Sequence, residues 1–458
     1  MKNRYDLTQG NILRQLLLVS LPVMGTSLVQ MAYNLTDLFW LGRYSTEAVS
    51  SAGFGGYFTW LGVAVILLAR IGTEVRIAQK TGSADRASAQ EYAVTGVQLI
   101  VILGFLYGVL LYFFPHFWLS FFNIEEALVY QGAVDYLTII AFGIIFYSLN
   151  PVLASTIIGT GNTLTPFLIS ASGLVINMIL DPLFILTFNW GVKGAAIATV
   201  LAQFFVTLFF FLYFFTSSSA LLYRVRYFKK MDGEKAKDIL RLGLPSAIQS
   251  AFFTFIAMAV SRIIVRESGQ LLAQVTAAQK IGSQLESLSW LISGGIATAL
   301  GAFVGQNVGA KKYQRVFQGV RYGLLSMSVY GVLVTIFLFF GAHSLYHIFL
   351  PNDPAAVDIG TDYLKILSLS QTFMIIEAII GGAFNGFGRT VPQSITSIVF
   401  NAARIPMALL LVQWLGINGI WWAISLSSIF KGIVLWLWFK ISVPEKELIA
   451  SELNPTIY

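Results

Sequence analysis

Two acidic side chains lie inside stretches of sequence that are otherwise apolar. Asp37 follows Tyr33 by four positions, and Asp181 follows Asn177 by four. Because residues four apart share one face of a helix, each acid has a polar neighbour beside it. A charged side chain at the centre of a bilayer costs at least about 2.5 kcal/mol on insertion scales, so such residues are functional candidates. A buried acid surrounded by neutral donors can exchange a proton.

The same spacing recurs at Thr199 and Gln203. We expect the three polar faces to turn toward the interior of one half of the molecule, where each carboxyl group finds hydrogen-bond partners. Pro22 lies about four turns before Asp37 in the same stretch, and an interior proline removes a backbone hydrogen bond and permits a kink. One hypothesis is that protonation of Asp37 changes the bend at Pro22; a static kink is the alternative.

The composition shows which elements must hold these residues. Apolar residues make up 56% of the 458 positions and charged residues only 11%, whereas soluble chains carry roughly 25% charged residues. Long apolar stretches without in-out alternation indicate membrane helices rather than a barrel. We predict an all-α membrane protein of twelve spans, at 12–40, 51–77, 93–114, 133–155, 164–188, 192–216, 239–264, 279–305, 318–342, 358–381, 394–415 and 417–440.

An internal repeat divides these spans into two sets of six. Five short matches occur in the same order, each offset by 223 to 227 positions. They are Leu21-Pro22 with Leu244-Pro245, Gln79-Lys80-Thr81-Gly82 with Gln306-Asn307-Val308-Gly309, Gly159-x-Gly161 with Gly386-x-Gly388, Asn177 and Pro182 with Asn401 and Pro406, and Gly191-x-x-Gly194 with Gly416-x-x-Gly419. Since each half has an even number of spans, we predict two lobes related by a pseudo-twofold axis along the membrane normal, an arrangement that favours a transporter.

The domain boundaries follow from the repeat and from the basic residues. We predict an N-terminal lobe at 1–216, a cytoplasmic linker at 217–238, a C-terminal lobe at 239–440 and a cytoplasmic tail at 441–458. Most of the Lys and Arg residues then fall on one side, which the positive-inside rule assigns to the cytoplasm. Both termini are expected to be cytoplasmic, in the inner membrane of a bacterium.

The repeat also provides a control within the sequence. Asp181 corresponds to Ile405, and Asp37 to Val260 or Ser261, so the second lobe keeps the pattern without these acids. A purely structural requirement should have kept acids in both lobes. Further candidates for lining a cavity are Met31, Asn150, Gln203, Glu286, Glu377 and Arg404, and Lys431 is another charge within a predicted span.

The sequence lacks the motifs that mark several other classes of function. The sequence has no G-x-x-x-x-G-K-[ST] phosphate loop, no H-E-x-x-H, no serine-nucleophile elbow and no cysteine, so it offers neither an ATPase engine nor an enzyme's catalytic group. We expect no enzyme activity, no metal and no cofactor. The net charge of +7 is explained by the basic loops and indicates a membrane surface rather than nucleic acid.

Taken together, these motifs resemble those of the multidrug and toxic compound extrusion (MATE) family, and within it the DNA-damage-inducible F (DinF) branch. The resemblance covers essentially the whole chain. It rests on Leu21-Pro22, Tyr33-x-x-x-Asp37, Gly159-x-Gly161-Asn162-Thr163-x-x-Pro166, Asn177-x-x-x-Asp181-Pro182 and Gly305-Gln306-Asn307-x-Gly309-Ala310. It implies two six-helix bundles in a V and antiport of organic cations against H⁺ or Na⁺. It further implies that the family's first-lobe proton or cation site is formed by Tyr33, Asp37, Asn177, Asp181 and Thr199, with Asn150 as an addition and Pro22 at the helix bend.

This sequence departs from the Na⁺-coupled, NorM-like branch of that family. That branch carries second-lobe acids in the seventh and tenth helices, whereas here the seventh-helix place is Phe253 and Glu377 is displaced by one turn. We therefore expect a monomeric exporter in the lipid bilayer that exchanges small lipophilic cations for protons. One alternative is Na⁺ coupling. Another is a lipid-linked oligosaccharide flippase, which would need a cationic cavity, for which only Arg404, Lys431 and Lys280 are candidates.

Overall fold

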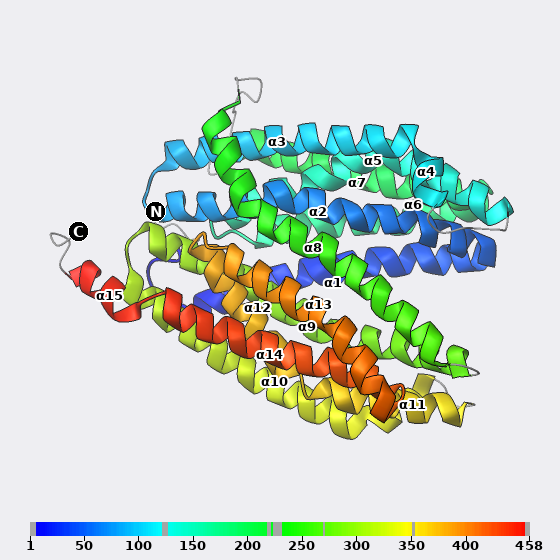
Figure 1. Ribbon diagram of the computed structural model, residues 1–458. Helices are drawn as coiled ribbons and strands as arrows, with labels where there is room; N and C mark the ends of the chain where they lie inside the picture. Colours follow the sequence, from blue (N-terminus) through cyan, green and yellow to red (C-terminus); the bar gives the residue numbers. More distant parts are fainter. Residues whose placement is uncertain are drawn as a thin grey trace. The chain divides into compact units, whose positions relative to one another are not determined.

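A computed structural model describes residues 6–120, 127–217, 221–222, 231–268, 271–349 and 353–453. Within these ranges every regular element is a helix (Figure 1). The helices are α1 (Ile12–Tyr44), α2 (Thr46–Gly82), α3 (Arg86–Phe113), α4 (Pro115–Ser120), α5 (Ala127–Ile158), α6 (Leu164–Pro182), α7 (Gly191–Thr216), α8 (Gly233–Ser268), α9 (Leu272–Gly309), α10 (Tyr313–Phe349), α11 (Pro354–Ser368), α12 (Gln371–Gly386), α13 (Val391–Leu415), α14 (Asn418–Ser442) and α15 (Glu445–Leu453). In the part of the chain that the structure describes, eleven helices are long and apolar enough to cross a membrane, and the bent pair α11 and α12 counted as one span supplies a twelfth. The all-α membrane fold is confirmed.

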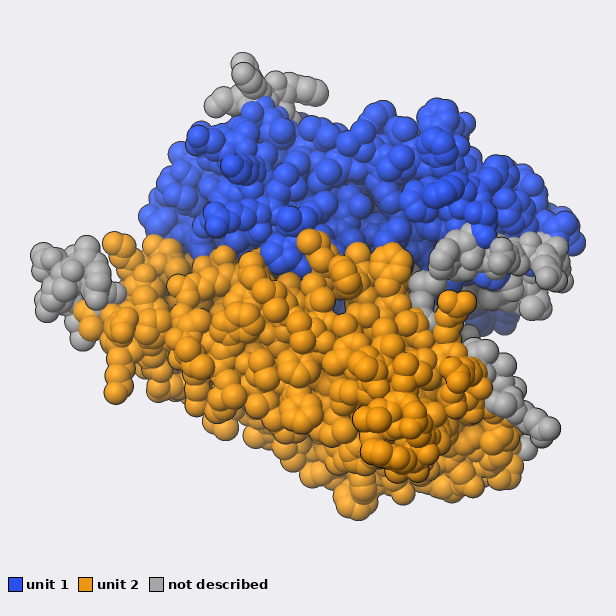
Figure 2. Space-filling view, viewed as in Figure 1, with its two compact units in different colours: residues 1–7, 21–247 blue, residues 8–20, 248–458 orange. Residues whose placement is uncertain are grey.

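The chain forms two compact units, which Figure 2 distinguishes by colour. Unit 1 comprises Met1–Leu7 and Leu21–Ala247, and unit 2 comprises Thr8–Ser20 and Ile248–Tyr458. Helices α1 and α8 therefore each begin in one unit and continue in the other, and each changes unit within two residues of a proline, Pro22 or Pro245. The linker and lobe limits given above stay predictions, and part of the linker lies outside the described residues.

The turns confirm the internal repeat at the level of the backbone. Positive φ angles recur at corresponding positions in the two halves, where few residues other than glycine are comfortable. The pairs are Ala84 (58°) with Lys311 (56°), Gly161 (90°) with Gly388 (73°), and Gly191 (52°) with Gly416 (57°). Duplicated motifs in the sequence therefore mark duplicated backbone conformations.

One short turn also shows why α3 begins where it does. Asp85 precedes the helix and accepts the backbone N–H of Ser88 at 3.1 Å, which satisfies one of the donors left free at the start of a helix. Hydrogen bonds from Ser88, helped by Lys80, hold the pKa of Asp85 below its usual range. The carboxylate is therefore the form that caps α3.

Unit 1 is built around α5, which packs against α2, α3 and α7. Apolar side chains from these helices form its core, including Ile100, Leu137 and Phe210, none of which is exposed. The opposite faces carry large apolar side chains such as Phe113 and Phe117, which are exposed as expected for a surface in contact with lipid. The packed interior of unit 1 is where its polar side chains meet.

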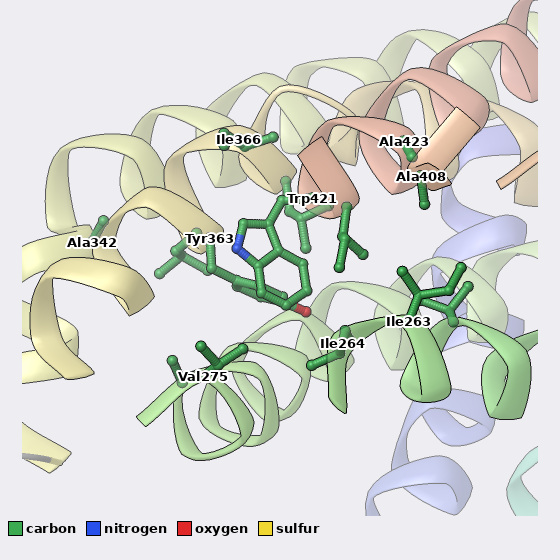
Figure 3. Close-up of a cluster of buried hydrophobic side chains, with 14 of the residues drawn as sticks. Ile263, Ile264, Val275, Ala342, Tyr363, Ile366, Ala408, Trp421 and Ala423 are labelled. Carbon is green, nitrogen blue, oxygen red and sulfur yellow. The ribbon is translucent and has the colours of Figure 1, made fainter. Parts of the chain in front are cut away.

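Unit 2 has a separate core, drawn in Figure 3. Trp421 of α14 and Tyr363 of α11 lie with their ring centroids 4.8 Å apart and their planes at 76°, the edge-to-face geometry that aromatic pairs favour. Ile263 and Ile264 of α8 and other aliphatic side chains surround them. Val260, one of the two positions that can correspond to Asp37, belongs to this apolar cluster.

The tenth predicted span, 358–381, is not one straight helix. Helices α11 and α12 meet at a 45° bend between Ser368 and Gln371, with no proline at the break. Side-chain donors replace the backbone hydrogen bonds that are lost at the bend. The Thr335 hydroxyl donates to the Ser368 carbonyl at 2.9 Å, and the Gln371 side-chain amide donates to the Leu367 carbonyl at 3.4 Å. Such substitutes are what allow a helix to break at membrane depth. The bend places Gln371 at the start of α12.

Candidate functional site

Helices α1, α6 and α7 bring four of the predicted site residues together inside unit 1. The hydroxyl of Thr199 donates to Oδ2 of Asp37 at 3.2 Å, and Nδ2 of Asn177 donates to Oδ1 of Asp181 at 3.0 Å. The two carboxyl groups lie within reach of each other. Asn177 and Asp181 are completely buried, and Asp37 is partly buried. The geometry thus forms one cluster from residues 162 positions apart in sequence.

Local backbone chemistry fixes the position of Asp181. Pro182 follows it and has no N–H to donate, so the regular helix α6 ends there. The next five residues, Leu183–Thr187, form a π-helical turn in which Phe188 N–H donates to the Leu183 carbonyl at 2.9 Å. Single π-helical turns occur often at functional sites. The Asp-Pro pair therefore presents the carboxyl group at the end of a regular helix.

Tyrosines flank the two acids, and glycines make room for them. Tyr33 is buried, and a Cβ at Gly173 would lie 2.6 Å from its hydroxyl. Among the described residues that hydroxyl has no hydrogen-bond partner, so Tyr33 is not bonded to Asp37. Tyr136 of α5 also lies near both acids, and a Cβ at Gly55 would be 2.5 Å from its ring. Sequence reasoning missed Tyr136 because neither its spacing nor its surroundings distinguish it from other aromatic residues.

A neutral polar layer lies beside the acids. Asn150 of α5 donates through Nδ2 to Oε1 of Gln203 at 2.8 Å, and its Oδ1 accepts from the Thr207 hydroxyl at 2.7 Å. Gln203 therefore pairs with Asn150, although it shares the helix face of Thr199. Thr207 was not predicted, although its position four residues after Gln203 was a usable signal. These three side chains satisfy one another without a charge.

The acids, by contrast, have oxygen atoms with no donor. In the part of the chain that the structure describes, Oδ1 of Asp37, Oδ2 of Asp181 and Oδ1 of Asn177 have no hydrogen-bond partner, and no Lys or Arg forms an ion pair with either acid. Two buried carboxylates close together cannot both stay ionised at low cost. One proton between them, or one small cation, would serve these oxygens.

Pro22 and Met31 lie on α1 outside this cluster. The helix continues through Pro22, whose carbonyl accepts the Thr26 hydroxyl at 3.1 Å. Met31 is partly buried. Neither residue has a contact that assigns it a role, so the bend and the cavity-lining role stay predictions.

The other predicted residues lie in unit 2, where charges are matched. Lys431 pairs with Glu377 at 2.9 Å, and both side chains are largely buried. Arg404 donates from Nε and Nη2 to the hydroxyls of Ser427 and Ser428, each at 3.0 Å. Oε2 of Glu286 accepts Nε2 of Gln371 at 3.2 Å. Two acids and two bases therefore share the interior of unit 2.

The class of protein follows from these observations. Twelve apolar spans, a duplicated six-helix architecture and buried ionisable residues inside each unit are features of a secondary membrane transporter. The sequence model of the MatE family matches residues 22–183 and 245–410. The chain therefore belongs to the MatE family, whose members are membrane transporters and not enzymes.

Relatives and solved structures agree with this assignment. The chain is 29% identical to the probable multidrug resistance protein NorM of Thermotoga maritima, over 96% of the chain and 94% of that protein. It is 25% identical to the probable multidrug resistance protein YpnP of Bacillus subtilis, over 95% and 96%. Its fold resembles a crystal structure of MATE in the bent conformation, with a TM-score of 0.90, 22% identity and coverage of 99% and 100%.

Proposed function

We propose that this protein expels lipophilic organic cations in exchange for protons, and that Asp37 and Asp181 bind the proton. The observation that carries the proposal is the buried carboxyl pair in unit 1, which has no cationic partner among the described residues. A structural ion pair would have a Lys or Arg beside it, as Glu377 has. Two acids without a basic partner form a site that can bind and release protons.

The coupling step follows from this arrangement. With both acids ionised, the site carries negative charge and favours a cation nearby. Protons that enter neutralise Asp37 and then Asp181, one proton for each carboxylate, so a bound organic cation loses its counter-charge. Because α1 carries both Asp37 and Pro22, protonation changes the bend of that helix, where the proline has already removed a backbone hydrogen bond.

The broad substrate class is supported by the relatives rather than by the site. The printed names of the Thermotoga and Bacillus proteins describe multidrug resistance. Aromatic residues form 14% of the chain, and aromatic faces attract flat cations. We propose on this basis that the substrates are small, lipophilic and cationic. We also propose that the protein is a monomer of the DinF branch. Its location would be a bacterial inner membrane, with both termini in the cytoplasm.

Sodium coupling has one specific observation in its favour. The three oxygens without donors, on Asp37, Asn177 and Asp181, are hard ligands of the kind that alkali cations accept. The flippase alternative is weaker, because one of its three candidate cations, Lys431, is engaged by Glu377. The side chain of Lys280, another of the three, lies outside the described residues.

Transport in liposomes decides between these possibilities. The purified protein is reconstituted, and efflux of a fluorescent lipophilic cation is measured under an imposed pH gradient and, separately, a Na⁺ gradient. We expect the pH gradient alone to drive efflux, and Asp37→Asn to reduce the rate to that of empty liposomes. Efflux driven only by Na⁺ would overturn proton coupling and leave the transporter assignment intact.

A matched variant separates coupling from general effects of removing an acid. Asp135→Asn makes the same chemical change in α5, where Asp135 pairs with Lys193 at 3.2 Å on a more exposed surface. This variant should transport at the wild-type rate, because an exposed ion pair contributes little. Equal loss in Asp37→Asn and Asp135→Asn would show that the assay reports folding and not coupling.

A further inference from the structure

Glu286 is a buried acid in unit 2 that the coupling step above does not use. It lies on α9 and is 4% exposed, and its partner Gln371 at the start of α12 is completely buried. Nε2 of Gln371 donates to Oε2 of Glu286 at 3.2 Å. Within the described residues, the other carboxyl oxygen, Oε1, and the amide oxygen of Gln371 both lack a hydrogen-bond partner.

The chemistry of an acid facing a primary amide explains these two free oxygens. A carboxylic acid and an amide form two hydrogen bonds at once, in which the amide N–H donates to one carboxyl oxygen and the acid O–H donates to the amide oxygen. An ionised Glu286 has no proton to give, so the Gln371 amide oxygen would stay buried without a donor even when another group donates to Oε1 of Glu286. Protonation of Glu286 satisfies both oxygens.

We infer that Glu286 is a second proton-binding residue, held in its acid form by Gln371. This site lies in unit 2 and shares no residue with the Asp37 cluster. Its ligand is a single proton, which leaves from Oε1 and removes the donor of the Gln371 amide oxygen.

The groups around Glu286 supply what the ionised form would need. Tyr363 of α11 lies beside the carboxyl group and can donate its hydroxyl when the proton leaves. Tyr346 of α10 is also near, but its hydroxyl is already bonded to the Ala278 carbonyl. Arg404 of α13 interacts with Glu286 electrostatically, without an ion pair, while its hydrogen bonds go to serines. The remaining charges, Glu377 and Lys431, are paired with each other.

The internal repeat gives an independent argument. The offset of 227 that relates Gly159 to Gly386 also relates Tyr136 to Tyr363. Tyr136 lies near the acids of unit 1, and Tyr363 lies near the acid of unit 2. A tyrosine at the same place in each half therefore faces an acid, although the acids themselves come from different helices.

Infrared spectroscopy tests the inference without relying on transport. The carbonyl stretch of a protonated carboxyl group is recorded at neutral pH for the wild type, Glu286→Gln and the matched variant Glu377→Gln. We expect Glu286→Gln to lose one protonated-carboxyl band, and Glu377→Gln to keep it because Glu377 forms an ion pair with Lys431. A spectrum of Glu286→Gln that matches the wild type in this region would overturn the inference, whatever the transport assay shows.

Two further variants keep the test decisive if Glu286→Gln does not fold. Tyr363→Phe removes the donor for the ionised form, so the band should persist to a pH about one unit higher, a tenfold change in proton affinity. Gln371→Leu removes the acceptor for the acid proton, so the band should shift in frequency. If neither substitution changes the pH range or the frequency of the band, Glu286 is not the group that carries it.

Discussion

The two units keep one fold and place different chemistry in it. In unit 1 two acids lie together with no basic partner among the described residues, and the layer of Asn150, Gln203 and Thr207 is neutral. In unit 2 the position that corresponds to Asn150 is Glu377, which is paired with Lys431. The positions that can correspond to Asp37 are Val260 and Ser261, and Val260 lies inside an apolar core. Duplication therefore preserved the scaffold while the charges were moved to other sites.

This difference indicates which charges respond to protons. A buried acid beside a base gains little from a proton, because protonation would leave the base without its counter-charge. An acid without a base gains much more from a proton. By this criterion the groups able to respond are Asp37 and Asp181 in unit 1, while Glu377 and Lys431 hold unit 2 together. Glu286 has Arg404 nearby without an ion pair among the described residues, and its response depends on the Gln371 amide.

The largest effect should come from moving an acid between corresponding positions. Val260→Asp places a carboxyl group in the apolar cluster of unit 2, and burial without a partner costs about 4 kcal/mol or more. We expect the variant to lose much of its thermal stability, measured by size-exclusion chromatography after heating in detergent. Asp37→Val, the reciprocal change, should stay folded and lose transport. Equal stability of the two variants would show that the units do not differ in this way.

Breaking the ion pair of unit 2 should have a somewhat smaller effect. Lys431→Met leaves Glu377 buried without a partner, which typically costs about 3–5 kcal/mol. Because the double variant Lys431→Met with Glu377→Gln removes both charges, it should recover most of the stability. The thermal midpoints of the two single variants and the double variant form a cycle. If the stability losses of the two single variants simply added in the double variant, a direct interaction between Lys431 and Glu377 would be contradicted.

The smallest effect should come from closing the space that holds Tyr33. A Cβ at Gly173 would lie 2.2 Å from the Val206 side chain and 2.6 Å from the Tyr33 hydroxyl, so Gly173→Ala should cost about 1–3 kcal/mol. Gly294→Ala in unit 2 is the control, since no atom lies within 4 Å of its added methyl group. That control should be neutral or slightly stabilising, because alanine favours a helix more than glycine does. Thermal midpoints of both variants check the contrast.

Much of the fold follows from local patterns that sequence alone displays. Apolar length predicted the spans, and the repeated glycine motifs mark turns that share positive φ angles, such as those at Gly161 and Gly388. The break between α11 and α12 could not be predicted, because no proline or glycine marks it. One of its carbonyls, that of Ser368, accepts the hydroxyl of Thr335, which is 33 positions away in sequence.

The candidate site was predictable to the extent that its contacts are local. The spacing of Asn177 and Asp181 leads directly to their hydrogen bond. The same spacing of Tyr33 and Asp37 does not lead to a hydrogen bond between them, because the Tyr33 side chain is directed to Gly173. Glu286 and Gln371 are 85 positions apart, and no pattern within one helix connects them. Only tertiary structure reveals a pair of that kind.

The division of α1 between the two units bears on how the chain is made. The start of α1 is held by residues synthesised much later: Lys312 donates to the Thr8 carbonyl at 2.9 Å, and Arg315 donates to the Gly10 carbonyl at 2.8 Å. At a synthesis rate of about 5–20 residues per second, these partners reach the membrane roughly 15 to 60 s after the segment that needs them. A cysteine placed at Gln15 should accordingly stay reactive in stalled chains that end before Arg315 and become protected in longer ones. The first helix to be inserted is thus among the last to be completed.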